Sequence, residues 1–348
     1  MPDLRAIVRT TVNHLVAPLG VSVVSHAQLQ GMRQRIERLA APLAATAVRE
    51  LPAGAAEYLR ADNPRLTELH SRYRAFASPA TAHSLWNKAH RAQIDLKYFR
   101  GDNPYIYQVR DDNRELHYLL TAFYLKSIDT LGLFGRLDED HLFGVHAVDC
   151  GNGWLVSRDL LDSISEILFL EEAIGISQIP RLRVLDIGAG YGRMGYRLAR
   201  ALPNLERMFC TDAVAESSFL CEYYLNFRGV AATATAVPLD EIGNAIAPNT
   251  IHLAMNIHSF SECSLPAVNW WLDLVANNRV RYLLIVPNAG ASENSLRTTE
   301  GGKPGRDFFP EIISRGYRLL KRRPKYCSPA LQKYGITPAY YYLFELAL

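Results

Sequence analysis

Residues 184–195 constrain the fold of this 348-residue chain more than any other segment. Their sequence, Val-Leu-Asp-Ile-Gly-Ala-Gly-Tyr-Gly-Arg-Met-Gly, passes from an apolar run through an acid into a glycine-rich turn. A helix is expected to start near Gly195. A strand, a turn with little side-chain bulk and a helix N-terminus together form a site for a nucleotide-like ligand. A tight turn without a ligand needs one glycine, whereas this segment has four.

Two motifs overlap in this segment. Gly190-x-Gly192-x-x-Gly195 matches the dinucleotide-binding fingerprint. Gly188-x-Gly190-x-Gly192, read after Asp186, instead matches the opening motif of Rossmann-like methyltransferases that use S-adenosylmethionine. A carboxylate at the strand tip repels a pyrophosphate in a low-dielectric crevice, but it attracts the sulfonium and ammonium groups of S-adenosylmethionine. We therefore expect S-adenosylmethionine as the cofactor.

A second acid, Asp212, follows the apolar stretch 207–211 and lies 26 residues after Asp186. This is close to the ~20-residue separation at which an acid on the second strand binds ribose hydroxyls. Asp212 is also suited to cap a helix over 215–224, and the two roles are compatible. A third strand at 233–237 would flank the adenine. The expected cofactor contacts are Asp186, Gly188, Ala189, Gly190, Tyr191, Gly192, Asp212, Ala213, Val237, Pro238 and Asn256.

The second half of the chain alternates strand and helix patterns, as a doubly wound sheet requires. Further strands are expected at 251–256, 280–286, 317–321 and 340–346, with a helix at 308–314. A closing pair in which one strand is inserted antiparallel distinguishes Rossmann-like methyltransferases from dehydrogenases. The sequence thus predicts an α/β fold, with a Rossmann-like class I methyltransferase sheet and a mainly helical N-terminal domain.

The first half has helical periodicity at 4–16, 25–51, 63–76 and 115–128. A hairpin turn is expected at 151–153, followed by an amphipathic helix capped by Ser157 and running to about Glu172. We expect residues 1–150 to form a lid and acceptor-binding region, 151–180 a connecting helix, and 181–348 the catalytic domain. The glycine-containing loop 289–306 is expected to be mobile and to close over the acceptor.

Residues 256–263, Asn-Ile-His-Ser-Phe-Ser-Glu-Cys, begin at the carboxyl end of the fourth strand, where open α/β sheets bind ligands. An alcohol becomes a good nucleophile when a base takes its proton, and His258 has a suitable ordinary pKa. Glu262 could orient the imidazole or bind a hydroxyl. The alternatives are a packing or capping role for His258 and a helix-surface acid at Glu262. His252 is expected to be structural.

Composition and charge exclude several other classes of protein. The net charge of +3 is dispersed, and the basic run at 321–325 is expected to be a solvated edge. Five cysteines without ligand spacing indicate reduced thiols. We expect a cytoplasmic protein, because there is neither a membrane-span-length apolar run nor a signal-peptide pattern. Nucleic-acid and membrane partners are not expected, no metal is expected, and a homodimer is compatible with the sequence.

Five segments resemble the family of sugar O-methyltransferases of bacterial natural-product and glycan clusters, relatives of the enzyme that methylates the deoxysugar of nanchangmycin. They are residues 98–105 (Tyr-Phe-Arg-Gly-Asp-Asn-Pro-Tyr), 156–163 (Val-Ser-Arg-Asp-Leu-Leu-Asp-Ser), 184–192, 256–262 and 284–288. The glycine-rich motif is shared by many methyltransferases, whereas the first two segments are more specific. The resemblance covers roughly residues 70–348.

The resemblance implies an S-adenosylmethionine-dependent O-methyltransferase that acts on a sugar hydroxyl of a glycan, glycoside or nucleotide-sugar. Tyr105, Tyr107 and Gln108 are then expected to contact the sugar, and Arg158 and Asp159 to reach the cofactor's carboxylate or the sugar. For these five residues, core tyrosines and an ion pair at a helix start are equally compatible explanations.

Other functions fit parts of the sequence. A small-molecule O-methyltransferase acting on a phenol or carboxylate would have the same sheet. Nucleic-acid methylation is disfavoured, because the Asn-Pro-Pro-Tyr type of motif is absent at the fourth strand, which has Asn-Ile-His-Ser at 256–259. A non-catalytic S-adenosylmethionine-binding protein is a third alternative, although the acids, the glycines and a candidate base argue against it.

Overall fold

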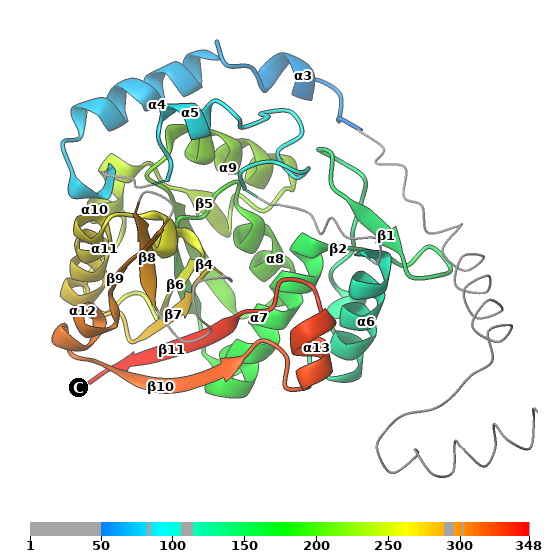
Figure 1. Cartoon of the computed structure of the whole chain (residues 1–348). Coiled ribbons are helices and arrows are strands. Elements are labelled where there is room, and N and C mark those ends of the chain that lie inside the picture. Colours follow the sequence, from blue (N-terminus) through cyan, green and yellow to red (C-terminus); the bar gives the residue numbers. More distant parts are fainter. Residues whose placement is uncertain (1–49, 82–84, 106–113, 289–295, 301–302, 348) are drawn as a thin grey trace, which may run out of the picture. The chain divides into compact units, whose positions relative to one another are not determined.

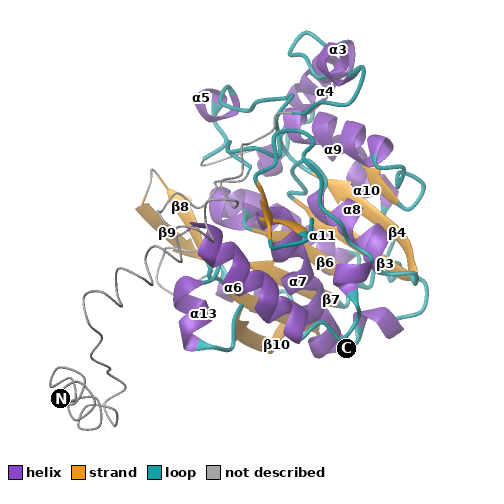
Figure 2. Ribbon diagram, turned by 90° about the vertical axis from the view of Figure 1, so that its right-hand side faces the viewer, coloured by secondary structure: helices purple, strands orange, loops and turns teal. Residues whose placement is uncertain are grey.

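The computed structural model describes residues 50–81, 85–105, 114–288, 296–300 and 303–347. Residues 47–348 belong to one compact unit, which Figures 1 and 2 show from two directions. The helices expected at 4–16 and over most of 25–51 lie outside the described residues. Among the described residues, no helix combines the length and apolar character needed to cross a membrane.

A seven-stranded sheet forms the centre of the unit, in the order β10-β11-β7-β6-β3-β4-β5. The strands β3 to β7 are mutually parallel, and β11 is inserted antiparallel between β7 and β10. This topology confirms the predicted class I methyltransferase sheet. The strands are β3 (Leu182–Ile187), β4 (Leu205–Thr211), β5 (Ala234–Ala236), β6 (Leu253–Ile257), β7 (Tyr282–Val286), β10 (Tyr317–Pro324) and β11 (Tyr340–Leu346).

Helices cover both faces of the sheet, and the middle strands β3, β6 and β7 are accordingly apolar almost throughout. Figure 1 shows α10, α11 and α12 on one side and α7 and α8 on the other. The helices are α7 (Arg158–Ile174), α8 (Arg193–Ala201), α9 (Ala215–Phe227), α10 (Ile242–Ala245), α11 (Leu265–Asn277) and α12 (Phe309–Ser314).

The longest of these helices, α7, is defined by its caps as the sequence predicts. The Ser157 hydroxyl accepts a hydrogen bond of 3.1 Å from the backbone N–H of Leu160. Gly175 ends the helix in the left-handed region, at φ 59°. Immediately before α7, the strands β1 (Ala147–Asp149) and β2 (Leu155–Ser157) pair around the predicted hairpin turn.

The first half of the unit is a set of short helices: α3 (Ala55–Tyr58), α4 (Pro64–Ala75), η3 (Pro79–Thr81), α5 (Lys88–Arg91), α6 (Arg114–Ser127) and η4 (Leu133–Gly135). Helix α4 packs against α9, where Arg65 donates to Glu222 at 2.8 Å and the hydroxyls of Tyr73 and Ser218 lie 2.6 Å apart. The short helices η5 (Ile176–Gln178), η6 (Leu239–Glu241), η7 (Ser259–Glu262) and α13 (Pro329–Tyr334) complete the described elements.

Three expectations need correction. Helix α8 begins at Arg193, two residues before Gly195, because Gly192 serves as its N-cap at φ 87°. The loop 289–306 contains the antiparallel strands β8 (Arg297–Glu300) and β9 (Lys303–Asp307), and the buried Thr298 hydroxyl accepts from Arg306 N at 3.0 Å.

The basic run 321–325 is the third correction, because its side chains are paired rather than simply solvated. Lys321 and Arg323 both contact Glu172, at 2.6 Å each. Lys325 is buried and contacts Asp162. Lys321 and Arg323 reach the same acid because alternate side chains of β10 point to the same face of the strand.

Candidate functional site

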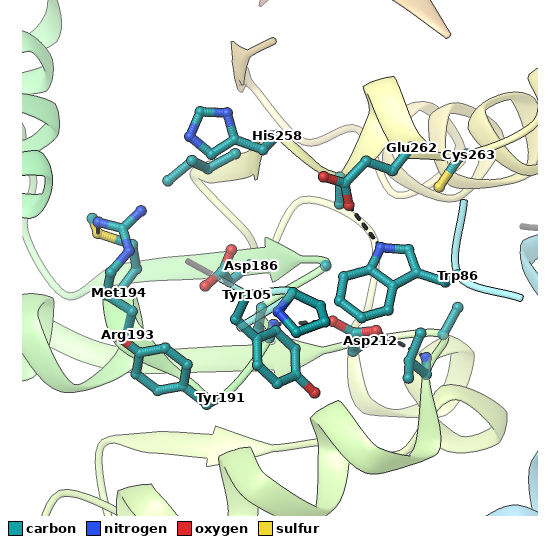
Figure 3. A pocket seen from close by; sticks show the side chains of 18 of the residues that line it. Trp86, Tyr105, Asp186, Tyr191, Arg193, Met194, Asp212, His258, Glu262 and Cys263 are labelled. Carbon is teal, nitrogen blue, oxygen red and sulfur yellow. Dashed lines mark hydrogen bonds between the residues drawn. The ribbon is translucent and has the colours of Figure 1, made fainter. Parts of the chain in front are cut away.

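The glycine-rich turn between β3 and α8 forms the floor of a pocket at the carboxyl end of the sheet (Figure 3). A Cβ on Gly188, whose φ is 73°, would lie 2.0 Å from the Ser259 hydroxyl oxygen. A Cβ on Gly190 would come within 3.5 Å of the Tyr105 ring. Gly188 therefore allows η7 to approach the backbone closely, whereas a Cβ on Gly190 would make only an ordinary contact with the ring.

Asp186, at the tip of β3, is a carboxylate that lacks a counter-ion. It is 3% exposed, and it makes no hydrogen bond or ion pair with any described residue. Burial raises the pKa of Asp186 to about 7, although the positive charge of Arg193 opposes this shift. That arginine is held by Glu166, with 2.8 Å between Nη1 and Oε2. A buried carboxylate without its own cation favours the binding of a cationic ligand.

Asp212, at the tip of β4, is held by two backbone groups. Its Oδ2 accepts a hydrogen bond of 2.9 Å from Gly190 N, and its Oδ1 accepts one of 2.8 Å from Val214 N. Burial raises the pKa of Asp212 to about 7, while the two N–H donors act in the opposite direction. The side chain therefore links the glycine turn to the start of α9, and its carboxylate can accept further hydrogen bonds from a ligand hydroxyl.

Two aromatic side chains from the first half of the chain lie over this end of the pocket. The ring centroids of Trp86 and Tyr105 are 5.5 Å apart, and the hydroxyl of Tyr105 lies 3.0 Å from that of Ser217. Trp86 also donates from Nε1 to Glu262 Oε2 at 2.7 Å. Residues far upstream in the sequence thus form one wall of the pocket.

Tyr191, in the glycine turn, is held in place by a network of buried hydrogen bonds and ion pairs. Its hydroxyl donates to Asp159 at 2.5 Å, and Asp159 also accepts from Arg100 Nε at 3.0 Å. Arg100 is fully buried and contacts Glu139 at 2.7 Å and Asp140 at 2.9 Å. Asp159 therefore supports the pocket from behind, through Tyr191, and does not line it.

His258 follows β6 and lies at the same end of the pocket as Asp186 and Arg193 (Figure 3). Its φ of 71° is unusual for a residue with a side chain, and its N–H donates to Val286 O at 2.7 Å. The ring Nδ1 is buried without a hydrogen-bond partner in the described part of the chain. Burial, followed by the positive charge of Arg158, lowers the pKa of His258 to about 3.

Glu262 lies at the other end of η7, close to Trp86 and Cys263 in Figure 3. Besides the bond from Trp86, its Oε1 accepts a hydrogen bond of 3.0 Å from Asn288 Nδ2. Burial raises the pKa of Glu262, and the two donors oppose this shift. The imidazole of His258 points away from this carboxylate, so the arrangement does not show Glu262 orienting it.

Asn256 is fully buried beneath the pocket. Its amide donates to Ile187 O at 2.9 Å and to the Ser259 hydroxyl at 2.5 Å, and its carbonyl oxygen accepts from Phe260 N at 2.9 Å. Asn256 therefore fixes the path of η7 relative to β3. Its role for the cofactor would be indirect.

The structure gathers ten of the predicted residues into one pocket: Tyr105, Asp186, Gly188, Ala189, Gly190, Tyr191, Asp212, Ala213, His258 and Glu262. Gly192, Val237, Pro238, Asn256, Arg158 and Asp159 do not line it. Arg158 forms an ion pair of 3.4 Å with Asp162 at the start of α7. This agrees with the structural explanation for Arg158 rather than with a ligand contact. Tyr107 and Gln108 lie outside the described residues.

Sequence reasoning missed nine lining residues: Trp86, Pro104, Arg193, Met194, Val214, Ile257, Ser259, Cys263 and Trp271. Arg193 and Met194 could have been found, because they lie inside the glycine-rich motif. Trp86 has no local signal, since it reaches the pocket from 176 residues before Glu262. Across the described ranges, no cluster of three or more His, Cys, Asp or Glu side chains is arranged to hold a metal ion.

Comparisons with known proteins give no family model and no curated protein that matches this chain. Solved structures do match it. The [4+2]-cyclase SpnF is 12% identical, with 66% of this chain and 96% of that chain covered and a TM-score of 0.41. Magnesium protoporphyrin IX methyltransferase (ChlM) from Synechocystis PCC 6803, which has S-adenosylmethionine bound, is 10% identical, with 70% and 100% covered and a TM-score of 0.39.

A third similar structure is that of mitomycin 7-O-methyltransferase MmcR, which is 16% identical, with 54% of this chain and 57% of that chain covered and a TM-score of 0.36. The three proteins differ in what their names say they do. The strand order described above gives this chain the class I methyltransferase fold, in which the cofactor site lies at the glycine-rich turn of the central strand. The reaction and the acceptor have to be inferred from the site itself.

Proposed function

We propose that this protein is an S-adenosylmethionine-dependent methyltransferase that acts on a sugar hydroxyl, carried by a glycan, a glycoside or a nucleotide-sugar. The observation that carries the proposal is Asp186, a buried carboxylate that borders the pocket without a cation of its own. S-adenosylmethionine, when bound, supplies an ammonium group and a methyl group on a sulfonium. The first of these matches the charge that Asp186 lacks.

The chain's own residues divide the binding task between the two ends of the pocket. Asp186 and Arg193 lie at one end, where a positive and a negative side chain suit the amino and carboxylate groups of an amino acid. Asp212 lies toward the other end, where its fixed carboxylate suits a pair of ribose hydroxyls. The apolar Ala213 and Val214 follow and suit a purine ring.

Most of the rate enhancement would come from alignment of the acceptor hydroxyl with the methyl group. Well-oriented reactants can contribute ~7–11 kcal/mol in favourable cases. The hydroxyl oxygen forms the new bond to carbon, the bond between carbon and sulfur breaks with its electron pair going to sulfur, and the hydroxyl proton leaves to a base. A base positioned in the pocket adds a further factor of about 10²–10⁴.

Two side chains are candidates for that base. His258 follows the tip of β6 and is neutral at pH 7, as a proton acceptor must be, but its pKa of about 3 makes it weakly basic. Glu262 borders the same pocket, and its pKa is raised by burial, toward the range that favours proton transfer. We retain His258 as the proposed base from its position and treat Glu262 as the competing candidate.

The sugar assignment depends on the family resemblance and on the chemistry of the wall opposite the glycine turn. Trp86 and Tyr105 provide aromatic faces of the kind that pack on pyranose rings. Glu262 lines the pocket beside them, and its carboxylate can accept hydrogen bonds from hydroxyls. A phenol would use the aromatic wall but would not need a further acceptor group, so the combination favours a polyol over the alternative small-molecule acceptors.

A transfer assay with methyl-labelled S-adenosylmethionine tests the proposal. The purified protein is incubated with nucleotide-sugars, glycosides and simple phenols, and cofactor binding is measured separately by calorimetry. Transfer of label to a sugar hydroxyl would support the proposal, provided that Asp186→Asn abolishes both this transfer and cofactor binding. Label on phenols alone would overturn the sugar assignment, and cofactor binding without transfer to any acceptor would favour a non-catalytic role.

A further inference from the structure

A second pocket lies beside the first and has a different chemical character. It is lined by the end of α4, the start of α9 and the short helix α5. Its polar side chains are His70, Arg74 and Arg91, and Tyr73 and Phe76 supply aromatic surface. The sequence analysis did not identify these five residues as candidate site residues, and the proposed function assigns them no role.

The two arginines of this second pocket are weakly neutralised. Arg74 is exposed and makes no hydrogen bond or ion pair with any described residue. Arg91 has a long contact of 3.7 Å with Glu216, and its Nε is buried without a hydrogen-bond partner among the described residues. The same carboxylate lies 3.5 Å from His70. Glu216 therefore faces one guanidinium group and an imidazole, and Arg74 has no acidic partner among the described residues.

Other arginines nearby are neutralised more completely. Arg72, on the same helix as Arg74, donates to Asp240 at 2.9 and 2.8 Å and to Glu241 at 2.5 Å. Arg65 donates to Glu222 at 3.0 and 2.8 Å. Close paired contacts of this kind are the usual arrangement for arginines in an ordered surface. Arg74 and Arg91 are therefore less completely neutralised than Arg65 and Arg72.

The second pocket adjoins the proposed cofactor pocket. Ala213, which follows Asp212, lines both of them. The short stretch from Trp86 to Arg91 contributes Trp86 to the first pocket and Arg91 to the second, and the rings of Trp86 and His90 are 4.9 Å apart. A ligand that packs against Trp86 can therefore extend past α5 to the arginines.

We propose that the second pocket binds a phosphate or diphosphate group carried by the acceptor, with Arg74 and Arg91 as its ligands. Guanidinium groups bind phosphate oxygens by charge-assisted, commonly bidentate hydrogen bonds, which suits a concave site with two of them. The inference builds on the proposed function, since it gives the acceptor an anionic group. It names the chemistry shared by a nucleotide-linked sugar and a sugar phosphate.

The first experiment measures the binding of inorganic pyrophosphate, with inorganic phosphate in parallel, to the full chain by calorimetry at low salt. We expect one pyrophosphate per chain and at least about 10-fold weaker binding in Arg74→Ala and in Arg91→Met, since a hydrogen bond to a charged group is worth that much or more. Glu216→Gln removes the opposing acid and should strengthen binding. Arg200→Ala, an exposed arginine on α8 without a described partner, should change nothing.

Pyrophosphate binding that is absent, or equally strong in all four variants, would overturn the site. The second experiment compares KM for a uridine diphosphate sugar, a sugar 1-phosphate and a neutral methyl glycoside. A rise in KM in the two arginine variants for the charged acceptors but not for the glycoside supports the inference, and the charged acceptor with the larger rise identifies the source. Equal KM values in wild type and variants would overturn the acceptor role.

Different experimental results would contradict the proposed function and the proposed phosphate site. A protein that transfers methyl groups but binds pyrophosphate independently of the arginines retains the proposed function and loses this site. A protein that binds pyrophosphate through the arginines but does not bind S-adenosylmethionine loses the proposed function. In that case the acceptor role of the second pocket is also excluded, although pyrophosphate binding there stands.

Discussion

The indole Nε1 of Trp86 donates a hydrogen bond of 2.7 Å to the carboxylate of Glu262, across the candidate cofactor pocket. A backbone bond of 3.2 Å from Leu85 N to Glu262 O runs alongside it. These two bonds join the first half of the chain to η7 at the carboxyl end of the sheet. The Trp86 side chain therefore both lines the pocket and opposes the rise in the pKa of Glu262.

Replacement of Trp86 by phenylalanine tests whether its hydrogen bond to Glu262 affects turnover. Phe keeps an aromatic face but removes the donor that lowers the pKa of Glu262, so the pKa should rise further. If Glu262 must be ionised for activity, the acid limb of the pH–rate profile should move to higher pH. A profile that does not move, with KM unchanged, would show that the hydrogen bond has no part in turnover.

A comparison of His258→Ala with Glu262→Gln distinguishes the two candidate bases. His258, with a pKa of about 3, stays neutral from pH 5 to 9, so a histidine base predicts a rate that is flat over that range. A Glu262 base predicts a rate that falls as the pH drops through its raised pKa. The variant that lacks the true base should lose about 10²–10⁴-fold in kcat with cofactor affinity retained. Equal loss of both properties would indicate a structural role.

Cofactor affinity should depend on pH through Asp186. Its pKa of about 7 means that the carboxyl becomes protonated as the pH falls below 7, and a protonated carboxyl no longer attracts an ammonium group. We expect affinity for S-adenosylmethionine to be highest above pH 7 and to fall by up to about 10-fold per pH unit below it. Asp186→Asn should bind weakly at pH 8 and show a flatter profile. Calorimetry between pH 5.5 and 8 measures this, and a flat wild-type profile would contradict it.

Gly188→Ala should be far more harmful than a matched glycine replacement elsewhere. The new Cβ would lie 2.0 Å from the Ser259 hydroxyl oxygen, and the φ of 73° is strained for alanine. We expect loss of cofactor binding, measured by calorimetry, and a lower melting temperature. Gly243→Ala on α10 meets open space, so its stability should be unchanged or raised by up to about 1 kcal/mol. Similar effects of the two replacements would contradict the conclusion that the close contact with Ser259 requires glycine at position 188.

The buried network behind Tyr191 should contribute strongly to stability. Arg100→Met leaves Asp159 buried without its ion-pair partner and removes one of the two arginines that contact Glu139, and breaking a buried pair typically costs about 3–5 kcal/mol. Arg181→Ala removes an exposed ion pair with Glu206 and should cost less than about 1 kcal/mol. Urea unfolding of the two variants measures both values. A cost below 1 kcal/mol for Arg100→Met would show that the network is not important for the fold.

The sheet could be predicted from the sequence because its middle strands are apolar runs that end in Asp186, Asp212 and Asn256. Buried parallel strands have this pattern, and helices between them fix the topology. Helix α11, which contributes Trp271 to the pocket, escaped notice although Ser264 is a regular N-cap, accepting from Ala267 N at 3.4 Å.

The wall of the site could not be predicted in the same way. Trp86 and Arg100 act through contacts with Glu262 and Glu139 that are distant in the sequence, and no periodicity or spacing encodes such contacts. The pKa of His258 could not be predicted from the sequence either. The sequence indicates a histidine with an ordinary pKa, whereas burial, followed by the positive charge of Arg158, lowers the pKa of His258 to about 3.

The insertion of β11 between β7 and β10 has a consequence for biosynthesis. During translation, β7 leaves the ribosome with its outer edge unpaired, and it stays so until residues 340–346 emerge about fifty residues later. An open edge of this kind is a template for pairing with other chains. Nascent molecules, and any product shortened before Tyr340, would therefore be the forms most prone to aggregate.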